Sequence, residues 1–450
     1  MAIQHSELMP KLFIVSLGCP KNLTDTEVMA GQLASAGFEL TAAVEEADVV
    51  LINTCAFLNS AVKESEAAIN RFISLKKRGK ISRIAVAGCL VEREKELLLK
   101  KFPQIDAVVG INALDRINSA LSGKKNYILP GAGPLTAPRL KMRLTAPHTA
   151  YLKVADGCDN RCAYCAIPMI RGPFRSKPVK DVVAEAKDLA ASGAREISLI
   201  AQDTTSYGMD ACGKPGLPAL LKRLVKLDGI DWLRLMYVYP EKISLEILEL
   251  MRDEKKICRY LDMPLQHISD NVLQRMNRRS TAGSIKAKIA EIRKLVPDLA
   301  FRTNFIVGFP GETERDFREL CGFVADTGFD NVGVFAYSRE AGTPAAAFPG
   351  QVPGKVKTAR MNELISVQSR VLDKKNAALV GRTVTVLMDS PIFGRTRRDA
   401  PEIDGRVEVI RDTGSGTRGP QLSAGKFVEV KITEASGYLR RGRVRRNTIR

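Results

Sequence analysis

The chain has 450 residues, of which 45% are hydrophobic and 26% are charged, and its formal net charge is +19. At roughly 150 residues per domain, this length suggests about three globular domains. The first residues, MAIQHSELMP, contain no apolar core of a secretion signal, and no apolar stretch reaches the roughly 18 residues that a membrane span needs. The sequence therefore predicts neither export nor membrane insertion, and we expect a cytoplasmic protein.

The positive charge predicts a polyanionic partner, most simply RNA or a ribonucleoprotein. The chain also contains nine cysteines. A disulfide framework is not expected in a reducing compartment, so the cysteines point to metal or redox chemistry.

Residues 11–123 are predicted to form an α/β domain with a parallel sheet. KLFIVSL (11–17), ADVVLINT (47–54) and RIAVAG (83–88) are short apolar strands, and helix-forming sequence follows each one. The helix after the first strand is expected over 24–37, where Thr24 and Glu27 fit a capping box.

A linker is expected over 124–143, where prolines and glycines interrupt the pattern. Over 144–374, six strand–helix units follow in one run. This arrangement favours a partial (βα)6 barrel with its working site at the carboxyl ends of the strands. A doubly wound open sheet is the alternative for this segment.

Residues 377–445 are predicted to form a small antiparallel β-barrel, because short β-rich runs alternate there with Gly, Pro and Asp. The final stretch, RRGRVRRNTIR, contains six arginines and no acidic residue. It is either a solvated tail or a nucleic-acid contact.

The strongest chemical signal is DGCDNRCAYCAIP, residues 156–168. Its cysteines form the pattern C-x-x-x-C-x-x-C at Cys158, Cys162 and Cys165. A zinc site would normally add a fourth Cys or His nearby, whereas an iron–sulfur cluster with three protein ligands leaves one iron open. The pattern therefore favours an iron–sulfur cluster over zinc and over three unrelated loop cysteines.

Three further cysteines share a position in the first domain. Cys19, Cys55 and Cys89 each follow the carboxyl end of a separate predicted strand. Ligands gather at that edge of a parallel sheet, so we expect these residues to hold a second cluster rather than to be buried core thiols.

The C-x-x-x-C-x-x-C spacing after the first strand of a six-unit segment resembles the radical S-adenosylmethionine (SAM) superfamily. The resemblance implies a 4Fe-4S cluster whose open iron binds SAM. An aromatic residue usually precedes the last cysteine in that superfamily, and Tyr164 stands there.

The whole chain resembles the radical SAM methylthiotransferases, in which a TRAM domain forms the C-terminal barrel. This resemblance implies two 4Fe-4S clusters, with Cys19, Cys55 and Cys89 holding the cluster that handles sulfur. It also implies an electron-donating reductant as a partner.

The stretches SLGCPKN, CDNRCAYCAIPMIRGPFRS and YLDMPLQHISD are closer to the branch that modifies an aspartate β-carbon in small-subunit ribosomal protein twelve. The alternative branch modifies a tRNA adenosine and commonly has GCQMN where this chain has GCPKN. The arginine-rich tail would suit tRNA. A third hypothesis is an RNA-binding iron–sulfur protein that senses redox state without turnover.

Weaker candidates lie at other strand ends of the central segment. The resemblance implies that GFPGET (308–313) forms a wall of the SAM site, with Gly308, Gly311 and Glu312 as contacts; a simple strand-to-helix turn is the alternative. His267, Gln202 and Asp203 are weaker site candidates. The last three cysteines are interpreted as structural thiols and are Cys212, Cys258 and Cys321.

Overall fold

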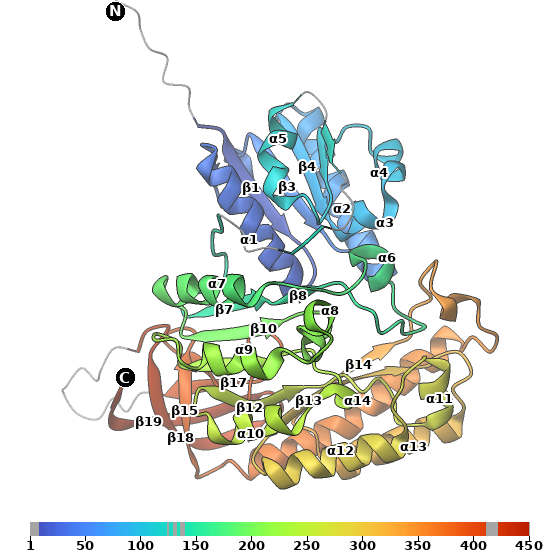
Figure 1. The fold of residues 1–450 in the computed structure, drawn as a ribbon, viewed down its shortest axis with the longest axis vertical. Helices are drawn as coiled ribbons and strands as arrows, with labels where there is room; N and C mark the ends of the chain where they lie inside the picture. The colour runs from blue at the N-terminus through green and yellow to red at the C-terminus, as the bar shows by residue number, and fades with distance from the viewer. Residues whose placement is uncertain (1–8, 124–125, 129–132, 136–139, 411–421, 450) are drawn as a thin grey trace, which may run out of the picture.

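The computed structural model describes residues 9–123, 126–128, 133–135, 140–410 and 422–449. These residues form an N-terminal α/β domain, a central α/β domain and a C-terminal β-barrel (Figure 1). The predicted fold class is therefore confirmed.

The N-terminal domain contains a six-stranded, wholly parallel sheet with the strand order β2-β1-β3-β4-β5-β6. All six residues of its central strand β3 are buried, as expected for a sheet covered by helices on both faces. The strands are β1 (Lys11–Ser16), β2 (Glu39–Leu40), β3 (Val49–Thr54), β4 (Arg83–Gly88), β5 (Ala107–Val109) and β6 (Asn126–Ile128). The helices are α1 (Pro20–Ser35), α2 (Asn59–Lys77), α3 (Cys89–Glu94), α4 (Glu96–Lys101) and α5 (Ile117–Ser122).

Two features of this domain differ from the sequence prediction. Strand β6 lies inside the range expected to be a linker and extends the sheet edge. Helix α1 begins at Pro20 with Cys19 as its N-cap residue, so the capping box at Thr24 is wrong. The Thr24 hydroxyl instead donates to the Lys21 carbonyl oxygen within the first turns.

The central domain contains six parallel strands in the sequential order β7-β10-β11-β12-β13-β14. Sequential order with an intervening helix is the pattern of a partial barrel, and it rules out the doubly wound alternative, in which the strand order reverses. The six strands are β7 (Thr149–Lys153), β10 (Glu196–Ile200), β11 (Trp232–Leu235), β12 (Ile257–Asp262), β13 (Ala300–Val307) and β14 (Asn331–Ala336).

Helices follow these strands and cover the outside of the partial barrel (Figure 1). They are α7 (Val179–Ala191), α8 (Met209–Cys212), α9 (Leu217–Leu224), α10 (Leu245–Asp253), α11 (Asp270–Arg275), α12 (Ala282–Leu295), α13 (Glu314–Thr327) and α14 (Gly354–Ala377). Helix α6 (Ile167–Arg171) instead packs against the core of the N-terminal domain, beside α3. A separate two-stranded sheet pairs β8 (Ala155–Asp156) with β9 (Arg175–Ser176). Short 3₁₀ helices lie at Val44–Glu46, Leu114–Arg116, Thr204–Ser206, Pro240–Lys242 and Pro344–Ala347.

The C-terminal domain is a closed five-stranded barrel with the order β15-β16-β17-β19-β18. Its pairings are antiparallel except for β17 with β19, which are parallel. Its strands are β15 (Thr383–Met388), β16 (Phe393–Thr396), β17 (Arg406–Ile410), β18 (Phe427–Ser436) and β19 (Leu439–Ile449).

This small barrel covers the amino-terminal ends of the central strands. Trp232, the first residue of β11, packs edge-to-face on Phe427 with ring centroids 4.9 Å apart. Glu196, the first residue of β10, accepts from Arg234 Nε at 2.8 Å and from Arg395 Nη1 at 2.6 Å. The opposite, carboxyl ends of the strands are therefore left for the N-terminal domain and for a functional site.

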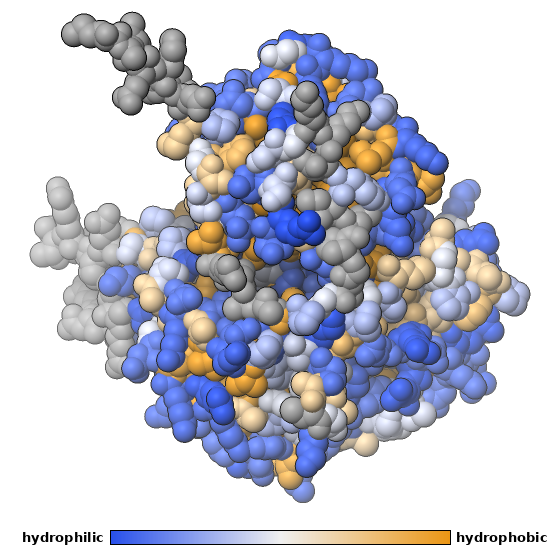
Figure 2. All heavy atoms as spheres, turned by 45° about the horizontal axis from the view of Figure 1, so that its top comes forward, coloured by the Kyte–Doolittle hydropathy of each residue, from blue (hydrophilic) through white to orange (hydrophobic). Residues whose placement is uncertain are grey.

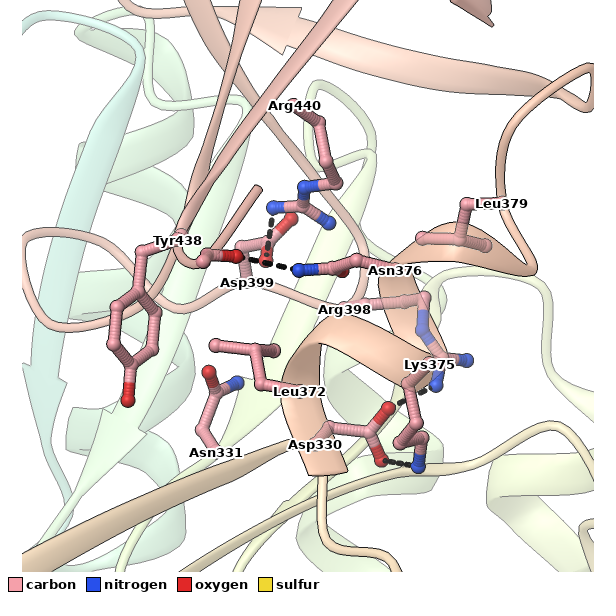
Figure 3. Close-up of a pocket in the computed structure, with 12 residues that line it drawn as sticks. Asp330, Asn331, Leu372, Lys375, Asn376, Leu379, Arg398, Asp399, Tyr438 and Arg440 are labelled. Carbon is pink, nitrogen blue, oxygen red and sulfur yellow. Dashed lines mark hydrogen bonds and ion pairs between the residues drawn. The ribbon is translucent and has the colours of Figure 1, made fainter. Parts of the chain in front are cut away.

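A small cavity of about 50 Å³ lies in this seam between α14, β14 and the C-terminal barrel (Figure 3). Its charged side chains pair with one another: Lys375 and Arg398 contact Asp330, and Arg440 donates to Asp399 at 2.6 Å. We interpret the cavity as part of a structural interface.

The face of the molecule in Figure 2 is mainly hydrophilic, with apolar side chains in separate small groups. Among the described residues, the helices that are long enough to cross a membrane are all too polar to do so.

Candidate active site between two cysteine triads

The first triad consists of Cys19, Cys55 and Cys89 and is called the N-terminal triad below. These residues follow β1, β3 and β4, which are direct neighbours in the parallel sheet. Cys19 caps α1, and Cys89 is the first residue of α3. The sequence prediction that all three lie at one carboxyl edge is confirmed.

The three thiols lie close together and are largely withdrawn from solvent. A Cβ atom added to Gly18, beside Cys19, would come within 2.7 Å of the Cys55 Cβ. Burial, together with the neighbouring Cys19 and Cys55, raises the pKa of the Cys89 thiol to about 11, although Arg171 acts in the opposite direction. Buried thiols in such a group become thiolates readily only where a metal supplies compensating positive charge.

The second triad consists of Cys158, Cys162 and Cys165 and is called the loop triad. It lies in the loop between β8 and α6, and the Cys165 N–H donates to the Cys162 carbonyl oxygen at 3.0 Å. Burial and the neighbouring Cys162 raise the pKa of the Cys165 thiol to about 12. The Cys162 Sγ lies 3.0 Å from the Tyr239 hydroxyl.

Three of the six cysteines directly follow a glycine in the left-handed region. The φ angles are +91° at Gly18, +96° at Gly88 and +79° at Gly157. A Cβ at Gly88 would lie 2.2 Å from Asn53 Oδ1, and one at Gly157 would lie 2.0 Å from the Pro173 carbonyl oxygen. Only glycine fits these tight turns, which present Cys19, Cys89 and Cys158 at the ends of their strands.

The donor sets fit iron–sulfur clusters. Each triad offers three soft thiolate ligands, the set that holds iron–sulfur clusters.

A buried network of charges joins the two triads across the domain interface. Arg171, from α6, donates to both carboxylate oxygens of Asp156 at 3.2 and 2.9 Å and to Asp25 Oδ2 at 3.0 Å. Its Nη2 also lies 2.7 Å from Asn22 Oδ1 and 3.5 Å from Cys89 Sγ. The residue that ends the loop-triad segment thus contacts the N-terminal triad.

Lys153 completes this network by contacting both Asp25 and Asp156. Burial by itself would raise the pKa of Asp156, but the charges of Arg171 and Lys153 hold it well below its usual range. The Asp156 carboxylate therefore stays ionised between two cations, and the ion pairs of Asp25 and Asp156 fix the N-terminal domain against the loop triad.

The sequence analysis missed Arg171, Lys153, Asp25 and Asn22. One signal was available: the run YLKVAD carries Lys153 and Asp156 in and just after a strand that is otherwise apolar. A buried charged residue in such a strand indicates a partner elsewhere in the fold. The identity of that partner depends on tertiary contacts.

The interior of the partial barrel offers polar groups for a small ligand. Gln202 Oε1 and Asn304 Oδ1 are buried without a hydrogen-bond partner among the described residues, and Asp262 Oδ1 has only a long ion pair, 3.6 Å from Arg302 Nε. They lie in or just after strands β10, β12 and β13. Buried polar atoms are normally paired, so this interior fits a polar ligand such as SAM.

The residues expected to contact SAM are brought together in part. Tyr164 packs edge-to-face on Phe309, within the GFPGET turn, at 6.5 Å between ring centroids. Gly308 and Gly311 have φ angles of +69° and +82°. A Cβ at these glycines would come within 2.4 Å of Lys357 and 2.6 Å of Arg275, so both pack against side chains of flanking helices. Their role as SAM contacts stays a prediction.

Glu312 and His267 face each other in a buried site beside this turn. Glu312 Oε1 accepts from Arg360 Nη1 at 2.9 Å, and its Oε2 lies 3.7 Å from His267 Nε2. Burial lowers the pKa of His267 to about 3 and raises the pKa of Glu312 to about 7. The Ser269 N–H donates to His267 Nδ1 at 3.0 Å, so the neutral imidazole carries its proton on Nε2.

Asp203 supports the loop triad from the end of β10. Its Oδ2 accepts from Asn160 at 2.8 Å and from Lys242 at 2.6 Å, and Asn160 Nδ2 lies 3.4 Å from Cys158 Sγ. Gln202 donates to Asp156 Oδ1 at 2.9 Å. Asp203 and Gln202, which the sequence suggested as site candidates, therefore form hydrogen bonds with residues next to the loop triad.

A larger cavity of about 430 Å³ opens beside the loop triad, between that loop, α11 and the segment before α14. Arg161 and Ala163 line it on the loop side. Of the remaining cysteines, Cys258 is fully buried and Cys321 is partly buried, while the Cys212 side chain lies outside the described residues.

Three family models match successive parts of the chain. Residues 11–110 match the family described as Uncharacterized protein family UPF0004, residues 152–324 match the Radical SAM superfamily, and residues 380–443 match the TRAM domain.

Curated relatives match almost the full length of the chain. The ribosomal protein uS12 methylthiotransferase RimO of Elusimicrobium minutum is 53% identical over 97% of this chain and 100% of its own length. The proteins of the same name from Geobacter sulfurreducens and Pelotomaculum thermopropionicum are 43% and 45% identical. Their matches cover 96% and 95% of this chain and 98% of each relative.

Solved structures share the fold at low sequence identity. The radical SAM methyltransferase TsrM from Kitasatospora setae superposes with a TM-score of 0.56 at 16% identity, covering 75% of this chain and 77% of TsrM. The cobalamin-dependent radical enzyme OxsB gives a TM-score of 0.50 at 13% identity, with 80% and 56% covered. By its relatives, its domains and its fold, the chain belongs to the ribosomal protein uS12 methylthiotransferase (RimO) family of radical SAM enzymes.

Proposed function

We propose that this chain inserts a methylthio group at the β-carbon of an aspartate in small-subunit ribosomal protein uS12. Its cofactors are two 4Fe-4S clusters and SAM. The observation that carries the proposal is the pair of cysteine triads joined by Arg171, which brings two cluster sites to one interface. The near full-length identity to proteins named as uS12 methylthiotransferases supports the choice of substrate.

The residues divide the work between two sites. Cys158, Cys162 and Cys165 hold one cluster, and Tyr164, Gly308, Gly311 and Glu312 lie on the SAM side of it. Cys19, Cys55 and Cys89 hold the cluster that handles sulfur. When bound, these groups supply a radical that removes hydrogen from the substrate carbon and the sulfur that replaces it.

The fold supports the direction from which a substrate enters. The C-terminal barrel covers the amino-terminal ends of the central strands, and Arg171 with Lys153 holds the N-terminal domain beside the carboxyl end of β7. The substrate residue therefore reaches the carboxyl ends of the strands between the N-terminal domain and the central domain.

The partners and boundaries complete the proposal. The basic C-terminal barrel contacts RNA around the substrate, a reductant delivers electrons, and the enzyme acts in the cytoplasm. The N-terminal domain extends from residue 11 to the end of β6 at Ile128, and the other two domains extend over 144–374 and 377–445. The tRNA adenosine reaction is the second candidate, favoured by the formal net charge of +19.

The decisive experiment incubates the anaerobically reconstituted enzyme, SAM and reductant with uS12 or with tRNA and measures product masses. We expect a methylthio increment on the aspartate of uS12. An increment on tRNA nucleosides alone would contradict the choice of substrate. A protein that releases no 5′-deoxyadenosine from SAM would be a redox sensor rather than an enzyme.

A matched variant tests the division into two clusters. Replacing all three loop-triad cysteines by alanine should abolish SAM cleavage but leave about half of the iron bound, because the N-terminal triad is intact. Loss of all iron would show that the two triads do not bind separate clusters.

A further inference from the structure

One buried lysine at the domain interface lacks a carboxylate partner. Lys21 lies in the first turn of α1, two residues after Cys19, and is only 8% exposed. Its Nζ donates to the Ala201 carbonyl oxygen at 3.3 Å, and no carboxylate oxygen of the described residues lies within 4.0 Å of it. A buried ammonium group normally requires a counter-ion, so this position suits an anion that the described residues do not supply.

The ammonium group lies at the strand ends of the partial barrel. Lys21 Nζ is 3.3 Å from the centroid of the Tyr237 ring, and Tyr237 and Ala201 follow β11 and β10. Lys21 therefore reaches from the N-terminal domain to the part of the barrel where the substrate is expected. The neighbouring cations Arg171 and Lys153 differ from it, because each is paired with Asp25 and Asp156.

The surface beneath Lys21 is held in place by the backbone. Tyr237 has a φ of +58°, an unusual conformation for a residue with a large side chain. The Tyr237 N–H donates to Asp262 Oδ2 at 3.2 Å, which fixes this conformation. Strained backbone of this kind is concentrated where a side chain must be presented to a ligand.

We propose that Lys21 binds the side-chain carboxylate of the substrate aspartate and so selects it against neutral side chains. The inference rests on the proposed function and identifies the residue that recognises the side chain of the substrate aspartate. The carboxylate carbon is bonded directly to the β-carbon, so an ion pair at Lys21 fixes that carbon at the strand ends, near Tyr237 and the Ala201 carbonyl. A neutral adenine base cannot pair with the ammonium group.

The test measures binding of two peptides to the reconstituted holoenzyme: the uS12 segment with its aspartate and the same segment with asparagine. We expect the wild type to bind the aspartyl peptide at least about tenfold more tightly, and Lys21→Met to bind both equally. Lys21→Arg should restore part of the preference. In Lys21→Met, SAM cleavage to 5′-deoxyadenosine should continue while the yield of methylthiolated product per cleavage falls.

Lys77→Met is the matched control, because Lys77 is an exposed lysine at the end of α2 in the same domain. Iron content and melting temperature identify a variant that has lost its cluster or its fold. Equal binding of both peptides by the wild type overturns the proposal without any variant. A Lys21→Met enzyme with full iron that still prefers the aspartyl peptide also overturns the proposal. The same conclusion follows if the only effect of Lys21→Met is weaker binding of tRNA. If the wild type fails to modify uS12 at all, the proposed function fails instead.

Discussion

At the scale of single residues, the site depends on backbone conformations that only a few side chains tolerate. Gly18, Gly88 and Gly157 each adopt a left-handed φ directly before a cysteine of a triad. The absence of a Cβ allows neighbouring strands to approach, and the turn then directs the thiol to the strand end. The cysteines are thus positioned by their preceding glycines.

Gly88→Ala tests this dependence. The new Cβ would lie 2.2 Å from Asn53 Oδ1 and 2.6 Å from the Thr54 carbonyl oxygen, at a φ of +96°. We expect a loss of about 3 kcal/mol in the free energy of unfolding and reduced iron binding at the N-terminal triad. Gly79→Ala is the control, because its φ is +71° and nothing lies within 4 Å; it should lose only about 1 kcal/mol. Equal losses in urea unfolding would show that the contacts at Gly88 are unimportant.

Glu312 predicts a pH dependence of stability. Its pKa is about 7 in the folded chain, above the 4.5 that is usual for a glutamate, because burial disfavours the charged carboxylate. The folded state therefore binds more protons between these two values, and stability falls as pH rises through this range. The wild type should lose about 3 kcal/mol between pH 4.5 and 8 relative to Glu312→Gln, which has no proton to lose. Parallel pH profiles of the two proteins in urea unfolding would contradict this assignment.

At the scale of elements, the beginning of helix α1 and the short helix α6 organise the site. Helix α1 begins directly after Cys19 because proline is favoured in the first turn, where its missing N–H costs nothing. Helix α6 follows the loop triad and carries Arg171 at its last position. The first two turns of α1 and the end of α6 together form the charged contact between the triads.

Arg171→Met should separate these elements. The substitution leaves Asp25 and Asp156 buried with Lys153 as their only cation, and breaking such a network costs about 3–5 kcal/mol. Arg223→Met, at an exposed position of α9, should change stability by less than about 0.5 kcal/mol. Both values come from urea unfolding of the holoenzyme, and a small loss in Arg171→Met would show that the network is dispensable.

At the scale of the whole molecule, the central barrel is contacted by both other domains. The C-terminal barrel closes the amino-terminal ends of the strands, while the N-terminal domain lies beside the β7 edge, where Lys153 at the carboxyl end of β7 contacts Asp25 (Figure 1). Ion pairs carry both contacts, and most of their side chains are buried. This arrangement leaves the carboxyl ends of the central strands available for the active site.

Glu196→Gln tests the docking of the C-terminal barrel. Glu196 is fully buried between Arg234 of β11 and Arg395 of β16, so its loss leaves two buried guanidinium groups without their shared carboxylate. We expect a destabilisation of about 3–5 kcal/mol. Glu246→Gln removes an exposed ion pair with Lys222 and should cost at most about 1 kcal/mol. Calorimetric melting curves in which both variants match the wild type would show that the pair does not hold the domains together.

The sequence alone indicated the classes of the three domains and favoured the partial barrel, and it located three cysteines at strand ends and three more in one loop. These features depend on local spacing: apolar runs of strand length, helical periodicity and a loop motif that the chain carries within thirteen residues. The start of α1 was misplaced because Thr24 imitates a cap inside a helix whose first turn contains Pro20.

Only the tertiary structure decided how the two triads meet. Arg171, Asp25 and Lys153 are separated by 18 to 146 positions along the chain, yet their side chains share one buried network. The partner of a buried charge is set by which elements pack together, and periodicity carries no information about that choice. The same holds for Lys21, because its lack of a carboxylate partner among the described residues depends on how the ends of strands β10 and β11 pack against it.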